Sequence, residues 1–220
     1  MPIQITTEQI KELRDATGIS VMQCKRALEE AEGDQKKALA ILKKVSSDIA
    51  EKKGGRVALD GAVMIKKSGK KAVLVSLHCE TDFVSRNADF LKLLSDLADL
   101  ALEKMSAQGG PALGWKKEAK DMIDPVIQKT GENIQLGEVY EASGDVLGDY
   151  VHNSKIAVIV SLSGGNTELA KDVAMHVAAM QSENIPELLE QPFIKNPDET
   201  VGKLLKKSKA AIKEVRRCSI

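Results

Sequence analysis

Two adjacent residues, His78 and Cys79, are the best candidates for enzymatic chemistry in this sequence. A histidine beside a cysteine can supply the base and the nucleophile of a covalent mechanism. They end an apolar run that predicts a β-strand, however, and consecutive side chains of a strand point to opposite faces. The pair is therefore poorly placed to share a proton, and Cys79 is better explained as a small, partly buried side chain.

The other residues that could do chemistry are scattered along the chain. The histidines His78, His152 and His176 lack cysteines or carboxylates at the spacing of a metal site. There is no glycine-rich loop ending in Gly-Lys-Ser/Thr and no dinucleotide-binding fingerprint, and Gly164 and Gly165 predict a turn. We therefore expect neither an enzyme nor a cofactor or metal site, and any control of a nucleotide would act on another chain.

The composition is that of a globular protein with no preference for nucleic acid. The 220 residues are 43% apolar, enough for one large domain or for a small and a medium one. The 32 basic residues balance 32 acidic ones, which argues against nonspecific binding to nucleic acid or a membrane. Three widely spaced cysteines fit a reducing compartment, and no apolar run approaches the length of a membrane span. We expect a cytoplasmic protein.

The most informative stretch is residues 79–87, Cys-Glu-Thr-Asp-Phe-Val-Ser-Arg-Asn. It connects a buried strand predicted at residues 71–77 to an amphipathic helix. Phe83 and Val84 are apolar where a connection should be polar, and Phe83 is one of only three phenylalanines. Phe83 could fold back on its own core or contact a partner.

An internal repeat organises the larger part of the chain. Residues 72–77, Ala-Val-Leu-Val-Ser-Leu, return at residues 157–162 as Ala-Val-Ile-Val-Ser-Leu, although chance similarity is an alternative. Each copy follows a candidate hairpin strand and precedes an apolar-striped helix, which predicts two related α+β subdomains with antiparallel sheets. The expected partners are strands at residues 61–65 and 148–152 and helices at residues 90–105 and 168–180.

The two copies differ where the strand passes into the helix. The second copy uses four turn-like residues, 163–166, whereas the first uses the longer segment 79–87. The apolar residues of the first copy are therefore not needed for chain reversal. Binding residues collect on loops of a rigid scaffold, so this difference favours a partner contact for Phe83 over a place in the core.

The N-terminal part has the start and stop signals of three short helices. Capping-box patterns begin two of them at Thr6 and Ser20, Gly18 and Gly33 are placed to end these two, and Asp34 can cap a third. Tight turns between them predict a compact bundle that resembles a ubiquitin-associated domain. Such a small bundle usually offers a surface to a partner.

The remaining patterns complete the predicted domain organisation. A helix interrupted or bent near Pro125 and a strand at residues 138–142 lie between the two copies of the repeat, and a last strand at residues 211–217 is expected to join the second sheet. The predicted divisions are a bundle at residues 1–45, a lysine-rich linker at 46–55 with partial helix near Ile49 as an alternative, a first subdomain at 56–140 and a second subdomain at 141–220.

Residues 79–90 closely resemble the signature of elongation factor Ts, a family of guanine-nucleotide exchange factors for elongation factor Tu. Further blocks similar to that family lie before and after this segment, in the order of the family, and span nearly the whole chain. They are residues 13–18, 22–28, 33–34, 144–152, 174–179, 191–193 and 200–205.

The resemblance implies a function and the residues that carry it. The matching Asp-Phe pair of the family enters the nucleotide domain of elongation factor Tu, so Asp82 and Phe83 are expected at the tip of the loop, with Thr81 and Val84 shaping it. Insertion of this loop is expected to disturb the magnesium and phosphate site of the partner and to release GDP, in support of translation elongation.

The resemblance implies two further contacts with the partner. Val21, Met22 and Lys25 match the N-terminal segment that packs on its nucleotide domain, although Met22 could equally belong to the core. His152 matches a residue that faces a different domain of elongation factor Tu.

The chain also departs from the family pattern. Many relatives insert a long helical hairpin where residues 184–190 here bridge the gap directly. Some short relatives dimerise, so a homodimer is an alternative state, and Cys218 could support an intermolecular contact, although a free thiol fits a reducing compartment better.

Two functions without nucleotide exchange remain as alternatives: a ubiquitin-type or peptide-binding adaptor, and a translation-associated RNA-binding protein. The neutral charge and the lack of aromatic stacking platforms argue against the second.

Overall fold

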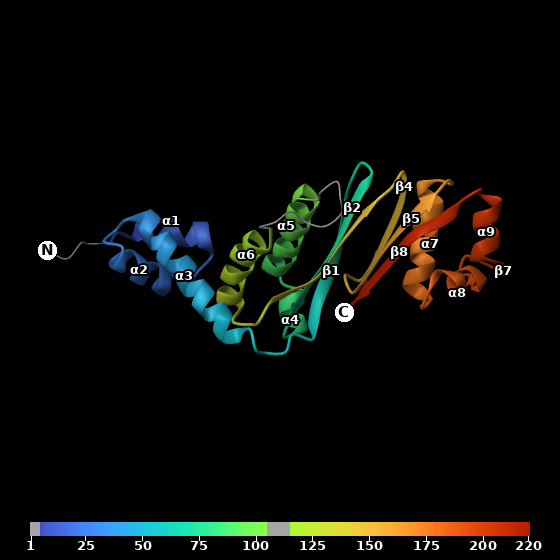
Figure 1. The fold of residues 1–220 in the computed structure, drawn as a ribbon. Helices are drawn as coiled ribbons and strands as arrows, with labels where there is room; N and C mark the ends of the chain where they lie inside the picture. Colours follow the sequence, from blue (N-terminus) through green and yellow to red (C-terminus); the bar gives the residue numbers. More distant parts are fainter. Residues whose placement is uncertain (1–4, 105–114) are drawn as a thin grey trace. The chain divides into compact units, whose positions relative to one another are not determined.

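The structure is a computed structural model that describes residues 5–104 and 115–220. The described residues combine helices with β-sheets, so the predicted α+β class is confirmed (Figure 1). They divide into two compact units whose segments alternate along the chain. The first unit comprises the described parts of Met1–Asp60, Cys79–Leu93 and Lys116–Gln135, and the second those of Gly61–His78, Leu94–Trp115 and Leu136–Ile220.

The first unit begins with the predicted helical bundle. Its helices are α1 (Thr7–Thr17), α2 (Val21–Glu30) and α3 (Gln35–Lys53). Thr6 and Gln9 form the complete capping box of α1, and Gly18 ends that helix in the left-handed conformation with φ of 67°. Ser20 caps α2 and Asp34 caps α3. A small core of leucine, isoleucine, alanine and cysteine side chains joins the three helices.

The third helix is longer than the sequence suggested. Residues 46–53 of the expected linker are helical, because α3 continues to Lys53. Ser46 is 1% exposed and its hydroxyl donates to the backbone oxygen of Leu42 at 2.9 Å. Ser46 also bonds the side chain of Gln128 on α6 (Trp115–Thr130), and Lys120 of α6 donates to Ser47 at 3.0 Å. The second half of α3 is therefore held by tertiary contacts with α6. The division of the chain into domains at the expected boundaries stays a prediction.

Three helices of the described residues lie between β2 (Lys71–Cys79) and β3 (Gln135–Ser143) in the sequence: α4 (Asp82–Ser85), α5 (Ala88–Lys104) and α6. Asn87 accepts the backbone N–H of Asp89 at 2.8 Å and so caps the start of α5, and the predicted end of that helix at Met105 lies outside the described residues. Pro125, expected to interrupt or bend α6, lies within a continuous helix.

The second unit contains two three-stranded sheets. The first has the order β1 (Asp60–Ser68), β2 (Lys71–Cys79), β3 (Gln135–Ser143), and the second has the order β4 (Val146–His152), β5 (Ile156–Ser163), β8 (Ala211–Ser219). Both pairings of the second sheet are antiparallel, with Tyr150 opposite Val158 and Val160 opposite Val215. The predicted repeat strands are thus β2 and β5, each the central strand of its sheet.

Two clusters of buried side chains among the described residues pack the second unit. One cluster combines Val63 and Leu74 of the first sheet with Leu147, Ile159 and Cys218 of the second, so the two sheets pack against each other. The other lies between the second sheet and the helices that cover it, α7 (Thr167–Ala179), α8 (Ile185–Glu190) and α9 (Val201–Lys207). A short hairpin of β6 (Pro192–Phe193) and β7 (Asn196–Thr200) connects α8 to α9. None of the described helices is long and apolar enough to cross a membrane.

Candidate functional site

The connection between β2 and α5 presents an aromatic side chain to solvent. Residues 82–85 form the one-turn helix α4 where a loop was expected. Phe83 is 88% exposed, whereas the next residue, Val84, is only 8% exposed. The alternative of a core position for Phe83 is therefore wrong, and Val84 is the residue of the pair that anchors the turn in the protein.

A carboxylate from a distant part of the chain holds the start of this turn. Glu132 Oε2 accepts the backbone N–H groups of Glu80 at 3.1 Å and Thr81 at 3.0 Å. Glu132 Oε1 accepts the hydroxyl of Thr81 at 2.6 Å. Three hydrogen bonds thus converge on one side chain, and those formed with an ionised acceptor are stronger than neutral ones.

A second carboxylate makes the reciprocal contact. Glu80 Oε1 accepts the backbone N–H of Asn133 at 2.6 Å and lies 3.5 Å from the guanidinium of Arg56. The hydrogen bond from Asn133, followed by the charge of Arg56, lowers the pKa of Glu80 below its ordinary value. The side chain of Asn133 is buried and donates to the backbone oxygen of Arg56 at 2.6 Å. The stem of the loop is therefore bonded to the turn that follows α6.

Local contacts complete the geometry of the turn. Asp82 and Arg86, one helical turn apart, form an exposed ion pair at 3.3 Å. The Cys79 thiol is buried and donates to the backbone oxygen of Thr81 at 3.2 Å. Asp82 and Phe83 are therefore held on a fixed support with their side chains directed to solvent or to surface neighbours.

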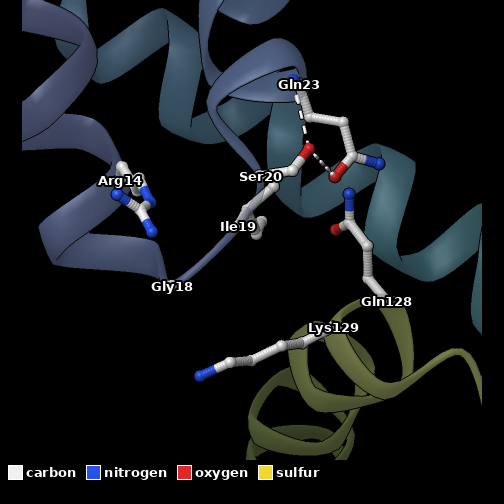
Figure 2. A pocket seen from close by; sticks show the side chains of 7 residues that line it. All are labelled: Arg14, Gly18, Ile19, Ser20, Gln23, Gln128 and Lys129. Carbon is white, nitrogen blue, oxygen red and sulfur yellow. Dashed lines mark hydrogen bonds between the residues drawn. The ribbon is translucent and has the colours of Figure 1, made fainter.

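The start of α2 presents a second group of exposed residues. Val21 is 48% and Met22 59% exposed, so the alternative of a core position for Met22 is wrong. Lys25 lies one turn further on and pairs with Glu29 at 3.7 Å in a solvent-exposed position. Beside this helix start, Ser20 donates to the side chain of Gln23 and accepts its backbone N–H, which fixes the first turn of α2 (Figure 2).

A polar hollow of about 220 Å³ lies next to the start of α2 (Figure 2). Seven residues of the first unit line it: Arg14, Gly18, Ile19, Ser20, Gln23, Gln128 and Lys129. Lys129 also pairs with Asp89 at 2.5 Å. Arg14 is exposed, as is Lys129, so the hollow is an open surface feature rather than an enclosed site.

His152 is exposed at the end of β4 in the second unit. Its ring stacks on that of Tyr150, with centroids 6.2 Å apart. Its Nδ1 lies 3.3 Å from the Tyr150 hydroxyl, and its Nε2 lies 3.2 Å from the side-chain amide of Asn153. The predicted site residues therefore form three groups: Thr81 to Val84 at α4, the three residues of α2, and His152.

Two of the histidines considered for catalysis or metal binding, His78 and His176, lie in packed surroundings. Burial, followed by the charge of Lys155, lowers the pKa of His78. His176 is fully buried, with Nε2 2.9 Å from the side-chain oxygen of Gln191 and Nδ1 accepting the backbone N–H of Ile194 at 3.3 Å. Within residues 5–104 and 115–220, no group of three or more histidine, cysteine or acidic side chains could hold a metal ion.

Sequence reasoning missed Glu132 and Asn133. They follow Gly131, which leaves α6 with φ of 77°, and a glycine after a helix followed by polar residues signals only a helix end. Their contact with Glu80 and Thr81 spans about fifty residues of sequence and depends on tertiary structure. A bonding pattern of this kind is visible only in the fold.

Phe83 on α4 and Met22 on α2 are apolar side chains exposed on helical turns, and exposed apolar side chains are common in protein–protein recognition. Residues 80–187 match a family model described as Elongation factor TS. The chain is 38% identical to elongation factor Ts of Hahella chejuensis, in an alignment that covers 94% of this chain and 89% of the relative. The corresponding protein of Marinobacter nauticus is 36% identical, over 92% and 86% of the two chains. This chain belongs to the elongation factor Ts family.

The alignments also show a difference in length. The match to the Hahella chejuensis protein extends over 256 aligned residues, more than the 220 of this chain, so the relative contains residues that this chain lacks. In this chain α8 begins at Ile185, soon after α7 ends at Ala179, with Asn184 as its cap.

Proposed function

We propose that this protein is a guanine-nucleotide exchange factor of translation elongation that binds elongation factor Tu with GDP bound and promotes release of the GDP. The observation that carries the proposal is the exposure of Phe83, 88%, on a turn whose stem is fixed by hydrogen bonds. Membership of the elongation factor Ts family supports the choice of partner. The protein would act on the nucleotide site of its partner and would not itself catalyse a reaction.

The proposed mechanism begins with insertion of Asp82 and Phe83 into the nucleotide domain of elongation factor Tu. A phenyl ring entering between two packed helices displaces them, because close-packed interiors transmit strain. This displacement would disturb the magnesium site and the backbone amides that hold the GDP phosphates. Those charge-assisted contacts supply much of the affinity for the nucleotide.

Thermodynamic linkage then accounts for the exchange. An exchange factor that binds the nucleotide-free state more tightly than the GDP-bound state weakens GDP binding by the same factor. A fixed turn favours this preference, since little conformational entropy is lost when Phe83 is inserted. Thr81 and Val84 would contribute by holding the turn, Thr81 through Glu132 and Val84 through its burial.

Further contacts would hold the partner while the turn is inserted. Val21 and Met22 offer apolar surface at the start of α2, and Lys25 adds a positive charge one turn away. His152 would contact a different domain of elongation factor Tu. A homodimer linked through Cys218 is disfavoured, because that thiol is 8% exposed in the core between the two sheets.

The test is stopped-flow release of a fluorescent GDP analogue from elongation factor Tu of the same organism. The protein should accelerate release, and the double variant Asp82→Ala/Phe83→Ala should lose most of that acceleration while keeping its circular dichroism spectrum. Acceleration that survives the double substitution would rule out the role of the turn. No acceleration by the unmodified protein would rule out the exchange function and favour the adaptor alternative.

A further inference from the structure

The residue that begins α4 does not use its hydroxyl to cap that helix. Thr81 stands at the N-cap position, where a threonine side chain ordinarily accepts a backbone N–H of the first turn. Its side chain makes no such bond. The hydroxyl instead donates to Glu132 Oε1 at 2.6 Å, and the Thr81 backbone N–H donates to Glu132 Oε2 at 3.0 Å. Both hydrogen-bond donors of the cap residue are thus directed to one distant carboxylate.

The support of Glu132 is itself fixed. Gly131 ends α6, its N–H donating to the oxygen of Ile127 at 2.9 Å, and the side chain of Lys53 at the end of α3 donates to the backbone oxygen of Gly131. On the other side of Glu132, the buried Asn133 bonds Glu80 and the backbone of Arg56. The carboxylate is therefore carried by a turn whose residues Gly131 and Asn133 bond Lys53, Arg56 and Glu80, which fixes its position.

We propose that Glu132 is a positioning residue for nucleotide exchange. By holding Thr81, it fixes the direction in which Asp82 and Phe83 leave the protein, so that the ring enters the partner in one geometry. This inference rests on the proposed exchange function and adds a residue to it. Glu132 does not contact the partner in this mechanism, and it acts only through Thr81 and Glu80. Fixing an inserted group before it binds raises the fraction of encounters that reach the productive state.

Two substitutions of Glu132 separate the contribution of its hydrogen bonds from that of its charge. Glu132→Ala removes all three hydrogen bonds. Glu132→Gln has the same shape, and its amide oxygen can accept the two backbone N–H groups while its NH₂ donates to the Thr81 hydroxyl, which is also an acceptor. Asp121→Ala removes an exposed carboxylate from α6, the helix that precedes Glu132, and is the control.

The first measurement needs no partner. Hydrogen exchange of the Glu80 and Thr81 amides in the free protein should be faster by about tenfold or more in Glu132→Ala, since both amides lose a hydrogen bond to a charged acceptor. Glu132→Gln and Asp121→Ala should remain close to the unmodified protein. Equal exchange rates in Glu132→Ala and the unmodified protein would overturn the proposal.

The second measurement is the rate of GDP release from elongation factor Tu as a function of exchange-factor concentration. Glu132→Ala should lower the maximal rate by about tenfold or more, as misplacement of a reacting group by about 1 Å can do. The half-saturating concentration should change by less than about twofold, because the residues at the start of α2 are untouched. Glu132→Gln should retain most of the maximal rate, and loss of activity equally in both variants would overturn the proposal.

Failure of this inference differs from failure of the function. If the unmodified protein accelerates release and Glu132→Ala does so equally, only the role of Glu132 is wrong. If the unmodified protein does not accelerate release, both are wrong. Should Glu132→Ala fail to fold, Thr81→Val supplies the comparison, since it removes the hydroxyl alone. An unchanged maximal rate in Thr81→Val would then overturn the proposal.

Discussion

Phe83 and Val84 are neighbours on a single helical turn but have opposite environments. The ring of Phe83 is in solvent, and the side chain of Val84 is buried together with Ser85, whose hydroxyl donates to the backbone oxygen of Asp82 at 3.2 Å. Successive residues of a helical turn are separated by about 100°, so one can face the protein while the next faces away. The turn thus combines a solvent-facing residue with a residue that secures it.

This contrast predicts different effects on stability. Val84→Ala should lower the free energy of unfolding by about 1–3 kcal/mol, because it removes buried methyl groups and leaves a cavity. Phe83→Ala should change it by no more than about 0.5 kcal/mol, as is usual for exposed positions. Urea denaturation followed by circular dichroism measures both. A larger loss for Phe83→Ala than for Val84→Ala would contradict the environments described for the two side chains.

At the scale of elements, α7 lies in very close contact with β4 in the second unit. Gly148 lies in β4, and a Cβ atom on it would stand 2.1 Å from the backbone carbon of Ala170 and 2.3 Å from the backbone nitrogen of Lys171. These atoms belong to the helix backbone and cannot move as a side chain can. A glycine at this position allows the helix to lie directly on the strand.

Gly148→Ala should therefore be severely destabilising. We expect the free energy of unfolding to fall by more than about 3 kcal/mol, at or above the upper end for overpacked cores, because the clash is with helix backbone. The variant could equally fail to accumulate as a folded protein. Gly55→Ala is the matched control, because a Cβ there would meet no atom within 4 Å, and it should change stability by no more than about 0.5 kcal/mol. Thermal unfolding of the two variants distinguishes them, and near-equal transition temperatures would refute the packing argument.

The sequence predicted those elements that adjacent residues determine. The capping pairs at Thr6 and Ser20 and the repeated strands β2 and β5 each depend on a few neighbouring side chains, and the structure contains them. The length of α3 was not predicted, because its polar second half packs on α6 through Ser46 and Ser47. Thr81 was identified, but its bond to Glu132 was not, since that contact is created by the fold.

At the scale of the whole molecule, the buried histidine of α7 links folding to pH. His176 Nδ1 accepts a backbone N–H, so the ring is neutral, with its proton on Nε2 facing Gln191. Burial lowers the pKa of His176 below its ordinary 6.5, and burial together with Lys155 lowers that of His78. Both histidines therefore favour the neutral form in the folded protein.

The sign of the pH dependence follows from these directions. Below pH 6.5 the unfolded chain binds protons at the two histidines before the folded chain does, so the free energy of unfolding should fall as the pH drops from 7 toward the folded-state values. Urea titrations at pH 7.0 and pH 5.5 measure this loss. His176→Gln should show a smaller loss over the same interval, and an identical loss in the variant would exclude His176 as a source.

The central claim is that Phe83 drives GDP release while the start of α2 holds the partner. The most direct test is the rate of GDP release from elongation factor Tu over a range of concentrations of the unmodified protein, Phe83→Ala and Met22→Ala. Met180→Ala, which truncates a 42% exposed side chain at the end of α7, is the control and should behave as the unmodified protein.

We expect Phe83→Ala to lower the maximal rate by about tenfold or more. Met22→Ala should raise the half-saturating concentration by about tenfold and retain the maximal rate, because truncation of an interface residue commonly weakens binding by about that factor. A maximal rate in Phe83→Ala equal to that of the unmodified protein would contradict the role of the exposed ring in nucleotide exchange.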